Sequence, residues 1–280
     1  MRQFEEEYIL INGIHHFLLH YPKAAGTPVL LYLHGGPGMF ESLFAYKLDT
    51  LWGDMFAQVH WDQRGAGKTL RRNGKTGLPE TTGQMLADLH GIVEYLRQKY
   101  QTDRIVLLGH SWGSVLGSLY ALQHPENVLA YIGAGQVISV MENERIGYQQ
   151  TLEMARKRGA QKHIRALEKL GEYPPEDPEA LLKLLPRMRK IQEAYDNGPV
   201  SGAGLGDMLK VIQGSPSFQW GDLVSFIRFM QVNRPLQLEM LTFDLDRLSL
   251  SYQTPVHYIL GEADNITPPP LCQDYFDRIS

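Results

Sequence analysis

One stretch of the sequence constrains the fold more than any other: an apolar run that leads into two glycines flanking a serine. Residues 105–108 are uninterruptedly apolar, which is typical of a strand buried on both faces of a parallel sheet. The sequence GHSWG follows at residues 109–113, and from Val115 apolar residues recur at helical spacing up to Pro125. A strand, a tight turn and a helix in this order predict that Ser111 lies in a strained turn, with its hydroxyl exposed at the start of a helix.

That position suits a nucleophile, because the N–H groups and the dipole at a helix start can stabilise an oxyanion. One N–H donor is expected from Trp112, the residue after the serine. A second buried strand, residues 29–33, runs into HGGPG at residues 34–38, where glycines let the backbone approach a substrate. We therefore predict Gly36 as the second donor, with Gly35 as the alternative.

A serine hydroxyl also needs a base to take its proton and a carboxylate to orient that base. On a sheet of this kind the order along the chain is Ser, then Asp or Glu, then His. Asp264 follows a predicted buried strand at residues 256–260, so we predict it as the acid, with Glu262 in reserve.

The histidine is harder to assign, because all ten histidines precede Asp264. His257 falls in a predicted buried strand and is expected to be a core residue. His34 and His110 belong to the motif loops and are poorly placed to accept the Ser111 proton. We expect the base beyond residue 280, together with a last strand and helix of the fold. The alternative is a degenerate hydrolase, which the intact motifs disfavour.

The rest of the chain alternates strands and helices, which predicts an α/β protein with a mostly parallel sheet and helices on both faces. Asn12-Gly13 predicts a hairpin between residues 8–11 and 14–21. Further strands are expected at residues 56–61 and 128–132, and Thr81 with Gln84 is a candidate capping box that opens a helix.

Between the predicted strands at residues 128–132 and 256–260 the pattern is helical, interrupted by a glycine-rich run at residues 198–206. A helical segment that divides one sheet indicates an inserted lid. We predict a core of residues 1–138, a helical lid of residues 139–246 and a second, truncated part of the core at residues 247–280.

Composition excludes several classes of partner. The 280 residues carry a net charge of −4, too mild to indicate nucleic acid or an anionic membrane. A single cysteine, Cys272, excludes an intramolecular disulfide and suits a reducing compartment. The N-terminus lacks an apolar segment, and no apolar run approaches the roughly 20 residues of a membrane span. We expect a cytoplasmic protein with a small-molecule or short-peptide substrate.

No cofactor or metal ion is expected either. Gly67-Lys68-Thr69 is similar to the end of a phosphate-binding P-loop, but the P-loop pattern requires glycine where this chain has Asp62. The lysine is therefore not predicted to bind a phosphate.

Taken together, four motifs resemble the proline iminopeptidase branch of the α/β-hydrolases. They are HGGPG at 34–38, DQRGAGKT at 62–69, GHSWGS at 109–114 and GEAD at 261–264. The resemblance implies the α/β-hydrolase fold and the release of an N-terminal residue, typically proline, from short peptides. By position it makes Ser111 the nucleophile, Asp264 the triad acid, and Gly36 and Trp112 the oxyanion hole. It also implies that Asp62 and Arg64 brace the floor of the active site.

The lid departs from this resemblance. Aminopeptidase members place acidic lid residues against the free amine of the substrate, and no glutamate of this chain aligns with them. Glu142 and Glu144 are candidates by location alone. Members with other lids act on esters, amides or carbon–carbon bonds. An esterase or amidase of the same fold, or a non-catalytic ligand-binding protein, are therefore the alternative functions.

Overall fold

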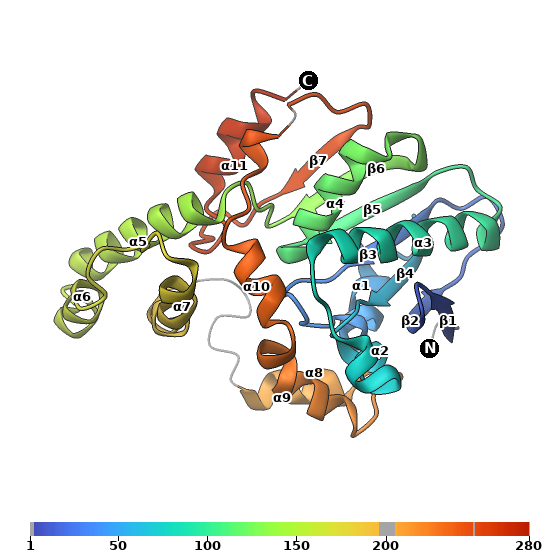
Figure 1. Cartoon of the computed structure of the whole chain (residues 1–280), viewed down its shortest axis with the longest axis horizontal. Helices are drawn as coiled ribbons and strands as arrows, with labels where there is room; N and C mark the ends of the chain where they lie inside the picture. The colour runs from blue at the N-terminus through green and yellow to red at the C-terminus, as the bar shows by residue number, and fades with distance from the viewer. Residues whose placement is uncertain (1–2, 196–204, 249, 280) are drawn as a thin grey trace.

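The computed structural model describes residues 3–195, 205–248 and 250–279, and a seven-stranded sheet forms its centre (Figure 1). Across the sheet the strands are β1 (Glu5–Ile11), β2 (Ile14–Tyr21), β4 (Ala57–Asp62), β3 (Val29–Leu33), β5 (Ile105–His110), β6 (Val128–Ala134) and β7 (Val256–Ile259). The pairs β1–β2 and β2–β4 are antiparallel, and the other neighbours are parallel. The predicted mostly parallel sheet is confirmed.

The N-terminal hairpin forms as its turn residues predict. Asn12 and Gly13 both adopt positive φ, at 48° and 80°, which matches the backbone twist that a two-residue hairpin turn requires. The register pairs Ile11 with Ile14 and continues to Glu5 opposite His20. β2 then joins the hairpin to the remainder of the sheet through β4.

Helices cover both faces of the sheet, as predicted. One face packs on α3 (Thr82–Tyr100), α4 (Trp112–Gln123) and α11 (Pro269–Phe276), and the opposite face packs on α1 (Ala45–Trp52). The apolar stripe of α3, from Met85 to Leu96, is buried against the sheet. Thr81 caps this helix by accepting the N–H of Gln84 at 3.1 Å, while the Gln84 amide oxygen accepts the N–H of Glu80 at 3.0 Å.

Between β6 and β7 the described residues form helices joined by loops, and no strand. The α-helices are α5 (Val140–Lys157), α6 (Gln161–Glu168), α7 (Pro178–Gln192), α8 (Leu205–Gln213), α9 (Asp222–Val232) and α10 (Arg234–Met240). An isolated antiparallel bridge between Ser139 and Asp244 brings the two ends of this segment together. The glycine-rich run at 198–206 falls mostly outside the described residues, and the division into core and lid stays a prediction.

The remaining elements are short. They are α2 (Gly67–Asn73) and the 3-10 turns η1 (Ser42–Phe44), η2 (Gly74–Gly77), η3 (Pro125–Asn127) and η4 (Leu245–Arg247). Within the described ranges, no helix combines the length and the hydropathy that a transmembrane span requires.

The prediction of a buried strand around His257 is wrong. Along β7, Val256 and Tyr258 are partly buried, whereas His257 and Ile259 are exposed. The ring of Tyr258 contacts Phe276 of α11 with centroids 5.4 Å apart, so the helix covers one face of the strand. Among the described strands β7 is the edge, and its other face is open; Ile259 is 49% exposed. Among the described residues His257 is therefore exposed, and it does not occupy the predicted core position.

Candidate active site

Ser111 occupies the sharp turn between β5 and α4. Its backbone torsions are φ 51° and ψ −116°, a conformation that costs free energy for any residue with a side chain. Its N–H donates to the carbonyl oxygen of Ala134 at 3.0 Å. Gly113 explains how the turn fits, because a Cβ on that residue would lie 1.9 Å from the carbonyl oxygen of Leu33. Only glycine lets α4 approach β3 so closely.

The two predicted oxyanion donors lie on loops at the same edge of the sheet. Trp112 is the first residue of α4, so its N–H has no acceptor within the helix. Gly36 has φ +120°, and a Cβ there would lie 2.5 Å from the nitrogen of Gly38. Gly36 lines the same cavity as Ser111. The roles of Gly36 and Trp112 as donors stay predictions.

A buried glutamine, which the sequence did not single out, connects these two loops. The Gln63 side chain donates from Nε2 to the carbonyl oxygen of His34 and accepts the indole N–H of Trp112, at 3.1 and 3.0 Å. Its backbone N–H donates to Nε2 of His34 at 3.1 Å. The available signal was its place in the DQRGAGKT motif, directly after β4.

Asp264 lies in the turn after β7, beside the cavity. Its Oδ1 accepts the N–H groups of Ile266 and Thr267 at 2.8 and 2.9 Å, and its Oδ2 accepts the Thr267 hydroxyl at 2.6 Å. Ile266 and Thr267 line the cavity together with Ser111. The reserve candidate, Glu262, is exposed. Within residues 3–195, 205–248 and 250–279, no hydrogen bond joins a histidine to Ser111 or to Asp264.

His110, directly before the nucleophile, pairs with a buried glutamate. Its Nδ1 lies 2.8 Å from Oε1 of Glu41, and the two side chains are 45% and 12% exposed. Burial opposes the charged imidazole, but the hydrogen bond and charge of Glu41 outweigh it, so the pKa of His110 lies above its ordinary value. Burial likewise opposes the Glu41 carboxylate, yet His110 and Tyr32 hold the pKa of Glu41 below its ordinary value.

His34 has a structural role, because its ring is buried and both of its nitrogens form hydrogen bonds. Burial lowers its pKa to about 4, so the ring is neutral near pH 7. Nδ1 lies 2.9 Å from the carbonyl oxygen of Gly35, and Nε2 accepts the N–H of Gln63. Both ring nitrogens are therefore occupied, which leaves neither free to take a proton from Ser111.

A cavity of about 400 Å³ lies over Ser111, between the sheet edge and α5, α7, α9 and α10. Most of its lining is apolar, with Val137, Leu185, Met240 and Ile266 among its walls. Its charged lining residues are His110 and Glu41, together with Glu144 on α5 and Arg189 on α7. An apolar cavity with a few polar groups is typical of a small-molecule site.

The two lid glutamates predicted as candidates differ in position. Glu144 is 3% exposed and lines the cavity, where it pairs with Arg189 and accepts the Tyr173 hydroxyl at 2.5 Å. Glu142 is 45% exposed and pairs with Arg145 on the surface of α5, outside the cavity lining. Only Glu144 can therefore meet a ligand bound over Ser111.

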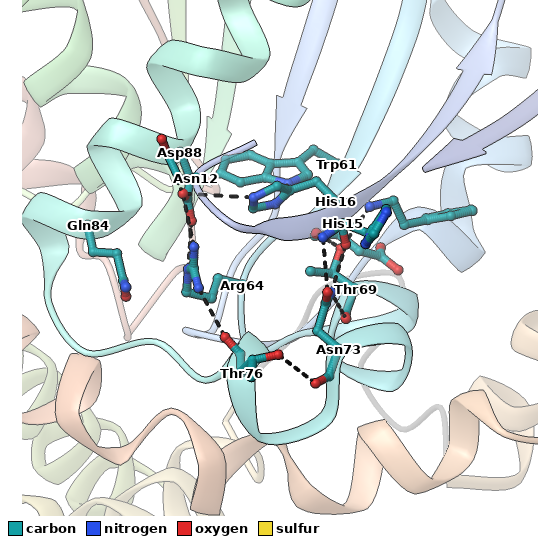
Figure 2. Close-up of polar contacts among 12 residues, drawn as sticks. Asn12, His15, His16, Trp61, Arg64, Thr69, Asn73, Thr76, Gln84 and Asp88 are labelled. Carbon is teal, nitrogen blue, oxygen red and sulfur yellow. Dashed lines mark hydrogen bonds and ion pairs between the residues drawn. The ribbon is translucent and has the colours of Figure 1, made fainter. Parts of the chain in front are cut away.

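Asp62 and Arg64 do not line this cavity. Oδ2 of Asp62 accepts the N–H of Lys68 at 2.8 Å, and burial raises the pKa of Asp62 to about 6. Arg64 donates to both carboxylate oxygens of Asp88, from Nε at 2.7 Å and from Nη2 at 3.2 Å (Figure 2). Both residues hold the loop that carries Gln63. They therefore affect the site through the position of this loop and not through contact with the cavity.

Lys68, in the P-loop-like segment, is 2% exposed. Its ammonium donates to Glu6 at 2.9 Å and to the hydroxyl and carbonyl oxygens of Ser217 at 2.7 and 2.8 Å. These contacts fill its three donors. That Lys68 binds no phosphate stays a prediction.

Comparison with known proteins agrees with this architecture. The family model of the α/β-hydrolase fold matches residues 28–276. The chain belongs to the α/β-hydrolase family. Its sequence relatives lie in the proline iminopeptidase branch, as the four motifs predict.

Two sequence relatives show how much of the chain is matched and at what identity. A Bacillus subtilis protein named as a probable aminopeptidase is 28% identical over 155 residues, which are 55% of this chain and 46% of that protein. The proline iminopeptidase of Neisseria meningitidis serogroup A is 31% identical over 135 residues, 47% of this chain and 40% of its own. The matched segments thus span less than half of either relative.

Solved structures show the same fold over nearly the whole chain. The proline iminopeptidase of Mycobacterium smegmatis has a TM-score of 0.67 at 20% identity, covering 98% of this chain and 87% of its own. A proline iminopeptidase-related protein from Thermus thermophilus has a TM-score of 0.62 at 21% identity. The match covers 99% of this chain and 86% of that protein. At this identity the likeness concerns the fold alone.

Proposed function

We propose that this protein is a serine hydrolase that releases an N-terminal residue, above all proline, from short peptides. The observation that carries the proposal is the geometry of Ser111: a strained turn at a helix start, below a largely apolar cavity of about 400 Å³. The peptidase names of the relatives support the substrate class.

In this reaction the Ser111 hydroxyl oxygen attacks the carbonyl carbon of the first peptide bond, and a C–O bond forms. The carbonyl electron pair moves onto its oxygen, which the N–H groups of Gly36 and Trp112 stabilise. The serine proton passes to a histidine oriented by Asp264, and from there to the departing amine as the C–N bond breaks. Water then hydrolyses the acyl-enzyme. That the histidine follows Asp264 in sequence stays a prediction.

The amine of the first residue lies two bonds from the attacked carbon, so it must bind close to Ser111. Glu41 is the candidate carboxylate, since it lines the cavity with Ser111 and its partner His110 directly precedes the serine. We therefore assign the ammonium contact to Glu41, in place of the lid glutamates. Deprotonation of His110 would leave Glu41 with an uncompensated negative charge for the ammonium group.

An ester or amide hydrolase of the same fold is the second candidate. The observation that favours it is that both carboxylates lining the cavity are already paired, Glu41 with His110 and Glu144 with Arg189. A substrate without an ammonium group would need neither carboxylate.

One assay separates these functions: turnover of a fluorogenic proline amide beside a short-chain ester, with the full-length protein. Amide turnover that Ser111→Ala reduces about 10³-fold or more is the expected result. Ester turnover without amide turnover would assign an esterase. A protein in which neither rate depends on Ser111 is a ligand-binding member of the fold.

A further inference from the structure

Arg189 lines the cavity and carries hydrogen-bond donors that have no partner among the described residues. It lies near the end of α7 and lines the cavity, with 27% of its side chain exposed. Nη1 donates to Gln192 at 2.6 Å and to Glu144 at 3.2 Å, and Nη2 donates to the other oxygen of Glu144. Glu144 therefore occupies the end of the guanidinium that Nη1 and Nη2 form. Nε–H and the second hydrogen of Nη2 have no partner within the described residues.

These two hydrogens lie on the same side of the planar guanidinium group. This side is one of the two that bind a carboxylate through parallel hydrogen bonds. Contacts with neighbouring side chains hold the group in place, because Glu144 accepts from Tyr173 as well as from Arg189. The free side is thus pre-positioned, which lowers the entropy lost when a ligand binds.

The surroundings favour an anion at this end of the cavity. Glu144 is 3% exposed and both of its oxygens already accept hydrogen bonds, so its charge is compensated by Arg189 and its acceptors are occupied. Asn143, its neighbour on α5, also lines the cavity, and its side-chain amide forms no hydrogen bond within the part of the chain that the structure describes. The lid wall therefore offers a guanidinium and an amide N–H₂ as donors, and its carboxylate is already occupied.

We propose that Arg189 binds the carboxylate of the substrate, and that the preferred substrates are dipeptides and tripeptides with a free C-terminus. This inference rests on the proposed function. The first residue of the peptide lies at Ser111 and Glu41, and the chain runs from there toward α7. A cavity of about 400 Å³ is near the small end of ligand sites, which suits a peptide of this length.

The test measures binding and not turnover. Calorimetry with the full-length Ser111→Ala protein compares Pro-Ala, Pro-Ala amide and Pro-Glu amide. We expect Pro-Ala to bind about 10- to 100-fold more tightly than its amide, the range for a hydrogen bond to a charged group. Recovery of affinity in Pro-Glu amide would show that an acidic side chain can replace the terminal carboxylate. If the affinity does not recover in Pro-Glu amide, the site recognises the C-terminal carboxylate itself.

The variant is Arg189→Gln with Glu144→Gln, which removes the guanidinium without leaving Glu144 charged and buried. In the Ser111→Ala background it should bring the affinities for acid and amide within about 3-fold of each other. The matched control is Arg145→Gln with Glu142→Gln, which removes an Arg–Glu pair exposed on α5. It should leave the ratio of the affinities for acid and amide unchanged. An unchanged melting temperature confirms that both variants fold.

Three results would overturn the inference: equal affinities in the parent protein, binding of neither peptide, or a preference for the acid that survives in the Arg189 variant. The proposed function fails separately. In one case the peptide acid binds more tightly than its amide, this preference depends on Arg189, and full-length protein with Ser111 cleaves no peptide. The carboxylate site is then supported and the peptidase assignment is wrong. If acid and amide are cleaved at equal rates and bound with equal affinities, the peptidase assignment stands and the carboxylate site falls.

Discussion

At the scale of single residues, Gln63 connects the two loops that carry the predicted oxyanion donors. Its side chain bonds the backbone before Gly35 and Gly36 on one side and the indole of Trp112 on the other. All of these groups are buried, so water cannot replace a lost partner. The position of the predicted donors therefore depends on a residue that touches no substrate.

Gln63→Leu should slow catalysis more than it weakens binding. We expect kcat to fall about 10-fold or more with KM changed less than about 3-fold, because the loss affects oxyanion stabilisation. The free energy of unfolding should fall by about 1–3 kcal/mol, since the carbonyl of His34 and the indole N–H are left unpaired.

Gln58→Leu is the matched control: Gln58 lies on β4, the strand that directly precedes Gln63. The Gln58 side chain is fully buried, and neither of its amide atoms has a hydrogen-bond partner among the described residues. Its replacement should leave kcat unchanged and the stability equal or higher. A Gln63→Leu enzyme with unaltered kcat, measured beside this control and urea unfolding, would remove Gln63 from its positioning role.

At the scale of elements, a buried ion pair joins the hairpin, the loop after β4 and α3 (Figure 2). Asp88 of α3 accepts hydrogen bonds from Arg64 and from the Asn12 amide, and His16 lies 3.8 Å from its Oδ1. The indole N–H of Trp61 donates to the other nitrogen of His16 at 3.1 Å. These contacts connect segments that lie 76 residues apart in the chain.

Asp88→Asn should destabilise the protein by about 3–5 kcal/mol, because it leaves the Arg64 guanidinium buried without its counter-charge. Chemical denaturation measures the change. Glu179→Gln breaks an Arg–carboxylate pair whose two side chains are 52% and 42% exposed, and should cost at most about 1 kcal/mol. Equal losses in the two variants would contradict the role of burial.

The elements that the sequence predicted correctly depend on local signals. Apolar runs, Asn12-Gly13 and the glycines of GHSWG each determine a strand or turn within a few residues. β7 was predicted wrongly because its burial depends on which of its faces neighbouring elements cover, and His257 is exposed among the described residues. Glu41, Gln63 and Arg189 were not singled out, because their partners come from other elements and no short motif records such contacts.

At the scale of the whole molecule, three buried histidines govern the response to acid. Burial lowers the pKa of His16 and of His34 to about 4, and that of His60 to about 3. Each has an ordinary pKa of 6.5 when unfolded, so the unfolded chain binds more protons between pH 6.5 and 4. Stability should therefore fall as the pH falls through this window.

Asp62 acts in the opposite direction. Burial raises its pKa from 3.8 to about 6, so the folded state binds more protons in that interval and gains stability as the pH falls. His110 and Asp222, whose pKa values are also raised, act in the same direction as Asp62. The three histidines, with pKa values lowered to about 3 or 4, outweigh these groups, so the net effect is destabilising.

His60→Phe should flatten this acid dependence. Neither ring nitrogen of His60 has a hydrogen-bond partner within the described residues, and the ring lies 5.1 Å from that of Tyr32. Phenylalanine should add about 1 kcal/mol at pH 7 by removing unpaired buried nitrogens, and more at pH 5. Thermal unfolding from pH 4 to 7 measures both effects. His257→Gln on the surface should leave the curve unchanged, and a His60 variant with the parental slope would contradict this assignment.

The central claim is that Ser111 is an activated nucleophile. The direct measurement is labelling of full-length protein with a fluorophosphonate, followed by mass spectrometry of the labelled peptide. We predict a single modification at Ser111, lost in Ser111→Ala and retained in Ser118→Ala, the replacement of a buried serine within α4. A protein that stays unlabelled, or is labelled equally after Ser111→Ala, would contradict the claim.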